Sequence, residues 1–139
     1  MFSIRTIIAG SAAETATVGQ TKLGAGLDIL PGVIVDQHFS QRGRTNRLLS
    51  AIASNPHFLA IGIDENTSIV VTKNVCSVIG DGSFTVLDIG KGLNGLPDRD
   101  DDADQDLALS GVNLHLLAEG SQFDLRNCMV MKVSGSDSN

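Results

Sequence analysis

The chain has 139 residues, of which 42% are hydrophobic and 19% charged, and its formal net charge is −6. This length and apolar content fit one folded domain with a hydrophobic core and argue against a disordered chain. The negative charge argues against a nucleic-acid partner, and no apolar stretch approaches the roughly 20 residues that a membrane-spanning helix needs.

The first thirty residues contain two short apolar segments. Ile7-Ile8-Ala9 runs into a small, polar stretch from Gly10 to Gln20, and this is typical of a strand remnant leading into a loop. Leu27 to Leu30 forms a second short segment, which the turn dipeptide Pro31-Gly32 closes.

The next segment has the pattern of a parallel crossover unit. Val33-Ile34-Val35 is continuous, aliphatic and partly β-branched, which predicts a fully buried strand. A helix is expected from Gly43 to Ser54, and Asn55-Pro56 ends it because the residue before proline resists helix. Phe58 to Ile63 predicts a second buried strand, parallel to the first.

From Ser68 onward the chain is rich in short β segments, which predict an antiparallel meander along one edge of the parallel sheet. Gly80-Asp81-Gly82-Ser83 has the composition of a hairpin connection. Strands are expected at Ser68–Thr72, Val75–Ile79, Phe84–Ile89, Val112–Leu117 and Met129–Val133.

Several polar and thiol-bearing segments favour ordinary roles. The acidic run from Asp98 to Asp106 lacks the glycine and terminal glutamate of a calcium loop, so we expect a solvated surface loop and no metal. Cys76 and Cys128 lie in apolar runs and predict buried free thiols rather than a disulfide framework. With no signal-peptide pattern at the N-terminus, a cytoplasmic location is expected. Residues 1–133 are expected to form one domain, followed by a disordered tail at residues 134–139.

Candidate catalytic side chains follow the two predicted parallel strands. His38 stands three residues beyond one strand and Glu65 two residues beyond the other. Because neighbouring parallel strands lie roughly 5 Å apart, these side chains can meet above the carboxyl edge of the sheet. A carboxylate bonded to one imidazole nitrogen leaves the other nitrogen as a general base, which predicts two members of a hydrolytic triad. A structural histidine is the open alternative.

An arginine cluster follows the candidate base. Arg42, Arg44 and Arg47 lie within six positions of an otherwise acidic chain. The planar guanidinium suits carboxylates, so the cluster indicates an anionic substrate. A solvated helix face with ordinary ion pairs is the alternative reading of the same residues.

Two blocks of sequence resemble the cyanophycinases. The first runs from Leu30 to Arg44, through Asp36-Gln37-His38-Phe39, and continues over Arg47 to Ile52; the second is Ile61-Gly62-Ile63-Asp64-Glu65-Asn66-Thr67. The separation of 27 residues between His38 and Glu65 is also that of the family. Val78–Gly80 to Val86–Asp88 and Gly111–Leu117 resemble the family's C-terminal strands, so the resemblance covers nearly the whole chain.

The resemblance implies a fold, an activity and a set of site residues. The fold is an α/β parallel-sheet sandwich similar to the class I glutamine amidotransferases, here its C-terminal half with an antiparallel β extension. The activity is serine-type hydrolysis of cyanophycin, an aspartate polymer carrying arginine, to β-Asp-Arg dipeptides. His38 is implied as general base and Glu65 as its orienting carboxylate. The implied substrate-binding residues are Asp36, Gln37, Arg42, Arg44 and Arg47. No cofactor is implied.

The nucleophile of the family is not found in this sequence. Its Gly-Thr-Ser-Ala-Gly turn has no counterpart, and Ser11, only 27 residues before His38, reads as a loop serine. The missing half should also supply central strands, so Val33–Val35 and Leu59–Ile63 are expected to expose edges. Two hypotheses remain: part of a cyanophycinase that needs a nucleophile-bearing half or works as a homodimer, or an inactive chain that binds polymer or a partner subunit.

Overall fold

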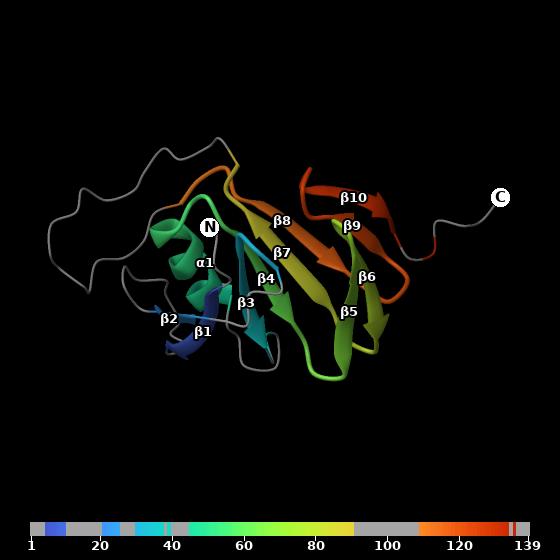
Figure 1. Cartoon of the computed structure of the whole chain (residues 1–139), viewed down its shortest axis with the longest axis horizontal. Coiled ribbons are helices and arrows are strands. Elements are labelled where there is room, and N and C mark those ends of the chain that lie inside the picture. Colours follow the sequence, from blue (N-terminus) through green and yellow to red (C-terminus); the bar gives the residue numbers. More distant parts are fainter. Residues whose placement is uncertain are drawn as a thin grey trace, which may run out of the picture.

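The computed structural model describes residues 5–10, 21–25, 30–37, 39, 45–90, 109–133 and 135. These residues form a mixed α/β structure with a six-stranded sheet, a four-stranded antiparallel sheet and one helix (Figure 1). The large sheet has the order β2-β1-β3-β4-β7-β8 and the small sheet β10-β9-β6-β5. The elements are β1 (Arg5–Gly10), β2 (Thr21–Ala25), β3 (Val33–Gln37), α1 (Thr45–Ser54), β4 (Leu59–Ile63), β5 (Thr67–Thr72), β6 (Val75–Gly80), β7 (Phe84–Asp88), β8 (Asn113–Leu117), β9 (Gln122–Asp124) and β10 (Met129–Lys132).

The predicted crossover unit is confirmed. β3 and β4 pair in parallel over their whole length, from Val33 opposite Leu59 to Gln37 opposite Ile63, and α1 connects them. The apolar face of α1 packs on the sheet because Leu48 and Ile52 are fully buried in one cluster with sheet residues of β3, β4 and β7. The helix ends as expected, where the Asn55 side chain donates to the carbonyl of Ala51 (3.0 Å). The predicted positions 43 and 44 lie outside the described residues.

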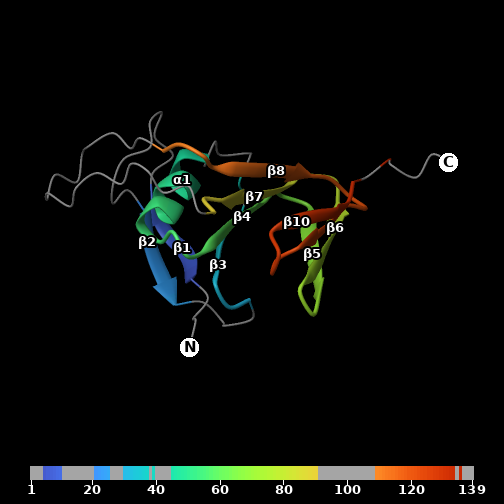
Figure 2. The ribbon, with the colours of Figure 1, turned by 90° about the horizontal axis from the view of Figure 1, so that it is seen from above.

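The second face of the large sheet packs against the small sheet. Side chains from both sheets form one buried cluster, with Ile61, Phe84 and Val86 from the large sheet and Val78 and Phe123 from the small one. Figure 2 shows the small sheet on the side of the large sheet that faces away from α1. The result is a helix, a sheet and a second sheet in three successive layers.

The meander prediction is wrong in part. β7 and β8 do extend the edge of the parallel strands, where β4 pairs antiparallel with β7. β5 and β6, however, belong to the separate small sheet, so Gly80–Ser83 connects two sheets rather than the strands of a hairpin. Burial explains the difference: β7 is buried at four successive positions, whereas β5 alternates between half-buried and exposed, as in a sheet covered on one face.

The sequence-based prediction also missed or shortened several strands near the two ends of the chain. Ile7–Ala9 lies within the six-residue strand β1, which pairs in parallel with β3 and antiparallel with β2. Neither β2 nor the three-residue β9 was predicted. The expected open edges of Val33–Val35 and Leu59–Ile63 are not seen, because β1 and β7 flank β3 and β4.

Some predictions fall on parts of the chain without a description. The acidic run Asp98–Asp106 lies outside the described residues, and so does the predicted tail apart from Gly135. Within the described part of the chain, no helix is long and apolar enough to cross a membrane.

Candidate active site at the carboxyl edge of the parallel strands

Two neighbouring parallel strands bring the candidate site residues to one edge of the large sheet. Gln37 ends β3 directly opposite Ile63, which ends β4, so the residues that follow each strand leave the sheet at the same level. Glu65 stands two residues beyond this level and is exposed. The ends of β3 and β4 therefore lie at one edge of the sheet, and Glu65 follows directly from this edge.

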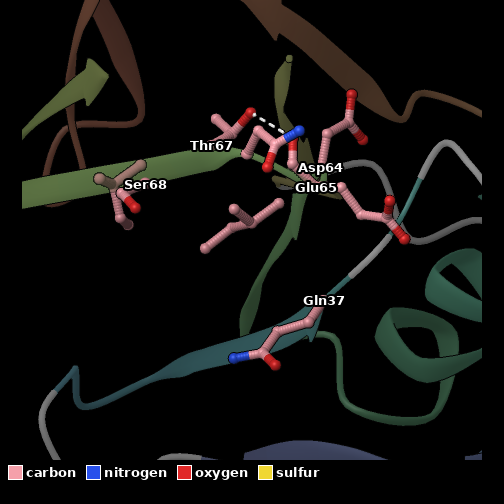
Figure 3. Close-up of a pocket in the computed structure, with 8 residues that line it drawn as sticks. Gln37, Asp64, Glu65, Thr67 and Ser68 are labelled. Carbon is pink, nitrogen blue, oxygen red and sulfur yellow. Dashed lines mark hydrogen bonds between the residues drawn. The ribbon is translucent and has the colours of Figure 1, made fainter. Parts of the chain in front are cut away.

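A pocket of about 380 Å³ lies at this edge (Figure 3). Gln37 reaches it from β3, and the chain from Ile63 to Ile69 forms the rest of its wall. Its polar lining includes Asp64, Glu65 and Thr67 as well as the amide of Gln37. Carboxylate, amide and hydroxyl groups thus line one concave site, and Figure 3 shows the side chains of Gln37 and Glu65 extending in different directions from its wall.

The corner that carries Glu65 is held by hydrogen bonds. Thr67 Oγ1 donates to the carbonyl of Glu65 (3.1 Å), as the dashed line in Figure 3 marks, and accepts from the backbone N–H of Gly82 (2.9 Å). The buried carboxylate of Asp64 accepts from the N–H of Ser83 (2.9 Å). The β4–β5 corner is thus fastened to the β6–β7 connection, which fixes the backbone from which Glu65 projects.

The β6–β7 connection packs so closely against this corner that two of its positions require glycine. A Cβ added to Gly82 would lie 2.5 Å from Thr67 Oγ1 and 2.7 Å from Asp64 Cβ. Gly80, at φ +112°, passes so close to the carbonyl of Asn66 that no side chain fits there. The sequence showed these glycines only as turn residues. Their close packing against the corner that carries Glu65 became visible only in the structure.

Asp36 and Arg47 form a buried ion pair. Arg47 Nε donates to Asp36 Oδ2 (3.0 Å), and Arg47 Nη2 bonds to Asp36 Oδ1. The two side chains are 1% and 7% exposed. Both were predicted to bind substrate. The structure instead joins them to each other across β3 and α1, and Asp36 directly precedes Gln37 in β3.

Position 38 itself lies outside the described residues, as do Arg42 and Arg44. The residues on either side of His38 in the sequence are described. Gln37 pairs with Ile63, and the N–H of Phe39 donates to the carbonyl of the same Ile63 (3.2 Å). Phe39 is buried and lies over Gly62, where an added Cβ would come within 2.4 Å of the ring. Glycine in β4 therefore provides the space that this ring fills.

Comparison with known proteins gives one consistent result. No protein-family profile matches the chain. The chain is 40% identical over 119 residues to the cyanophycinase of Geminocystis herdmanii, an alignment that covers 85% of this chain and 43% of that protein. It is 38% identical over 120 residues to the cyanophycinase of Trichormus variabilis, covering 86% and 40%. Against the cyanophycinase of Synechococcus elongatus the identity is 35% over 125 residues, covering 89% and 38%.

All three relatives are cyanophycinases, and their alignments with this chain have similar lengths. Each spans most of this chain and less than half of the relative. Sequence identity at this level, over more than a hundred residues, indicates common descent. The chain is therefore homologous to part of these cyanophycinases and spans about two fifths of their length.

Proposed function

We propose that this chain supplies the base and the orienting carboxylate of a cyanophycinase-type serine peptidase site, within a fold similar to the class I glutamine amidotransferases. The observation that carries the proposal is the pocket that Gln37 and Glu65 share at the ends of β3 and β4. His38 follows Gln37 directly in the sequence. Similarity to cyanophycinases over most of the chain supports the assignment of this edge.

In the proposed mechanism, Glu65 accepts a hydrogen bond from one imidazole nitrogen of His38. This interaction fixes the tautomer and stabilises the imidazolium that forms during the reaction. The other nitrogen takes the proton of a serine hydroxyl as its oxygen attacks the scissile carbonyl. The imidazolium then returns that proton to the leaving amine, and water, activated in the same way, hydrolyses the acyl-enzyme.

The serine has to come from another segment. No Gly-Thr-Ser-Ala-Gly turn occurs in this sequence, so in this proposal the nucleophile and the oxyanion donors lie on a further stretch of polypeptide, in the same protein or in a partner subunit. The proposed assembly would carry out the hydrolysis of cyanophycin to β-Asp-Arg dipeptides.

The predicted substrate residues receive different roles in this proposal. Gln37 is exposed and lines the pocket, so we assign it to the substrate directly. Arg42 and Arg44 are assigned to the α-carboxylates of β-Asp-Arg units by their charge and their place after His38. Asp36 and Arg47 are bonded to each other beneath the site, and we assign them to holding the end of β3 in place.

Complementation tests the proposal. The chain is co-produced with the part of the Geminocystis herdmanii cyanophycinase that it does not match, and the release of β-Asp-Arg from cyanophycin is measured. Release is expected, and His38→Ala should lower it by at least about a thousandfold. Saturable binding of polymer by a folded complex without any release would favour the alternative, a binding protein without catalysis. Release that survives His38→Ala would remove His38 as the base.

A further inference from the structure

A second cavity, of about 510 Å³, lies at the opposite ends of β3 and β4 from the candidate active site. Val33 and Leu59, the first residues of these strands, line it, whereas Gln37 and Ile63, the last residues, line the active-site pocket. Val33 and Gln37 are four residue steps apart along the strand, which is about 13 Å. The cavity is therefore a distinct place in the fold.

The walls of this cavity are mainly aliphatic. They come from both sheets and from the segment before β3, and the aliphatic residues among them also belong to the buried inter-sheet cluster. The apolar side chains in the wall are those of Leu30, Pro31, Val33, Leu59, Val71 and Leu125. Such a wall favours a ligand with an apolar body, because burying the ligand removes apolar surface on both sides from water.

Two cations stand at the same cavity. Lys73 and Arg126 line it, and both are exposed. Their neighbours in the chain are directly bonded, since the N–H of Leu125 donates to the carbonyl of Asn74 (2.8 Å). That bond joins the β5–β6 connection to the β9–β10 connection and brings the two basic residues to adjacent stretches of backbone.

The backbone conformation at Lys73 strengthens this arrangement. Lys73 has φ 57°, in the left-handed region that lysine rarely adopts, within the two-residue connection between Thr72 and Val75. Asparagine or glycine would adopt this conformation more readily. Lysine is thus not the residue that the local backbone conformation favours at this position.

Charge in and around the cavity favours an anion. The lining contains two cations and no carboxylate, although the chain as a whole carries a net charge of −6. Asp124 is the nearest acid in sequence to Arg126, and its carboxylate accepts hydrogen bonds from the N–H groups of Arg126 (2.9 Å) and Asn127 (3.0 Å). Its charge lessens the attraction but does not line the cavity.

We propose that this cavity binds an amphipathic carboxylate, with its aliphatic body between the two sheets and its carboxylate between Lys73 and Arg126. The proposal is independent of the peptidase assignment because the two sites share no residue. A ligand here would rest on β3 and β4, the same strands that end at the candidate active site.

Titration with octanoate tests the proposal, with 1-octanol as the neutral analogue of the same chain length. Backbone amide shifts of the intact chain report the position, and Asn74 and Leu125 should move with octanoate. Each exposed ion pair contributes little by itself, so both cations are replaced together. Lys73→Asn combined with Arg126→Gln should weaken octanoate binding at least about fivefold. Lys73→Asn suits the left-handed backbone, so the variant keeps its fold.

The matched control is Lys132→Gln, which removes a positive charge from the far end of β10. It should leave octanoate binding within about twofold of the parent. Equal affinity for octanoate and 1-octanol, equal loss in the control variant, or amide shifts confined to residues outside the cavity would each overturn the proposal, as would the absence of binding at millimolar octanoate.

Discussion

The guanidinium of Arg47 is joined to the carboxylate of Asp36 by two bonds, Nε to Oδ2 at 3.0 Å and Nη2 to Oδ1. This pair connects α1 to the penultimate residue of β3 beneath the candidate active site. Arginine's fork satisfies both carboxylate oxygens, which is what allows two charges to be buried together. The strand end that leads to His38 is therefore held by a side-chain bond as well as by the sheet.

Removing one partner of this pair should destabilise the fold strongly. Arg47→Met leaves the Asp36 charge buried without its counter-ion, and we expect a loss of about 3–5 kcal/mol in the free energy of unfolding. The double variant Asp36→Leu, Arg47→Met should recover most of that loss because it buries no charge. Urea unfolding measures both, with Arg126→Met as the exposed control. A double variant as unstable as the single one would contradict the account.

Gly62 and Phe39 should be coupled by their packing. Gly62→Ala pushes a methyl group into the Phe39 ring, at 2.4 Å, and should cost about 1–3 kcal/mol. When Phe39→Leu is combined with Gly62→Ala, the combined loss should be smaller than the sum of the two single losses, because the smaller side chain leaves room for the methyl group. A double-mutant cycle by urea unfolding measures the coupling. Strict additivity would show that the ring does not lie over Gly62.

The Thr67 hydroxyl should stabilise the corner that carries Glu65. Thr67→Val keeps the shape of the side chain but removes the bonds to the Glu65 carbonyl and from the Gly82 N–H, with an expected loss of about 1–2 kcal/mol. Thr67→Ser should retain most of the stability. Thr72→Val, at the exposed end of β5, is the matched control. Equal effects at positions 67 and 72 would argue against a role for these two bonds.

Cys76 should make stability fall in alkaline solution. Burial, with a smaller contribution from the Asp124 charge, raises the pKa of this thiol to about 11. Its stabilising contribution is complete below the unfolded-state pKa of about 9 and is lost as pH rises through the folded pKa, because the unfolded chain ionises first. The unfolding free energy of the parent should therefore fall more steeply between pH 8 and pH 11 than that of Cys76→Ala, by about 2 kcal/mol in total. Parallel pH profiles would contradict this assignment.

The sequence predicted the parallel unit well because its signals are local. A continuous apolar run such as Val33–Val35 and the Asn55-Pro56 stop depend on neighbouring residues alone. The partner of each later strand depends on distant residues, so the assignment of Gly80–Ser83 to a hairpin failed when β6 and β7 entered different sheets. Burial of Arg47 was equally invisible, because an arginine three residues after Arg44 fits an exposed helix face just as well.

The placement of Glu65 followed from the same local signals. Its position two residues after a buried strand fixed it at the sheet edge, and the shared pocket with Gln37 agrees with that placement. The hydrogen bonds that hold its backbone involve Thr67 and Gly82. These two residues belong to different connections between strands, and no sequence pattern predicts that they lie together.

The most direct test of the central proposal compares Glu65→Gln with Glu119→Gln in the complemented protein, by the rate of β-Asp-Arg release from cyanophycin. Glu119 is an exposed glutamate in the connection between β8 and β9, so its variant makes the same acid-to-amide change elsewhere. Glu65→Gln should lower kcat by about a hundredfold or more, because an amide cannot stabilise the imidazolium of His38, while Glu119→Gln stays within about twofold of the parent. Equal rates for the two variants would show that Glu65 is not the orienting carboxylate.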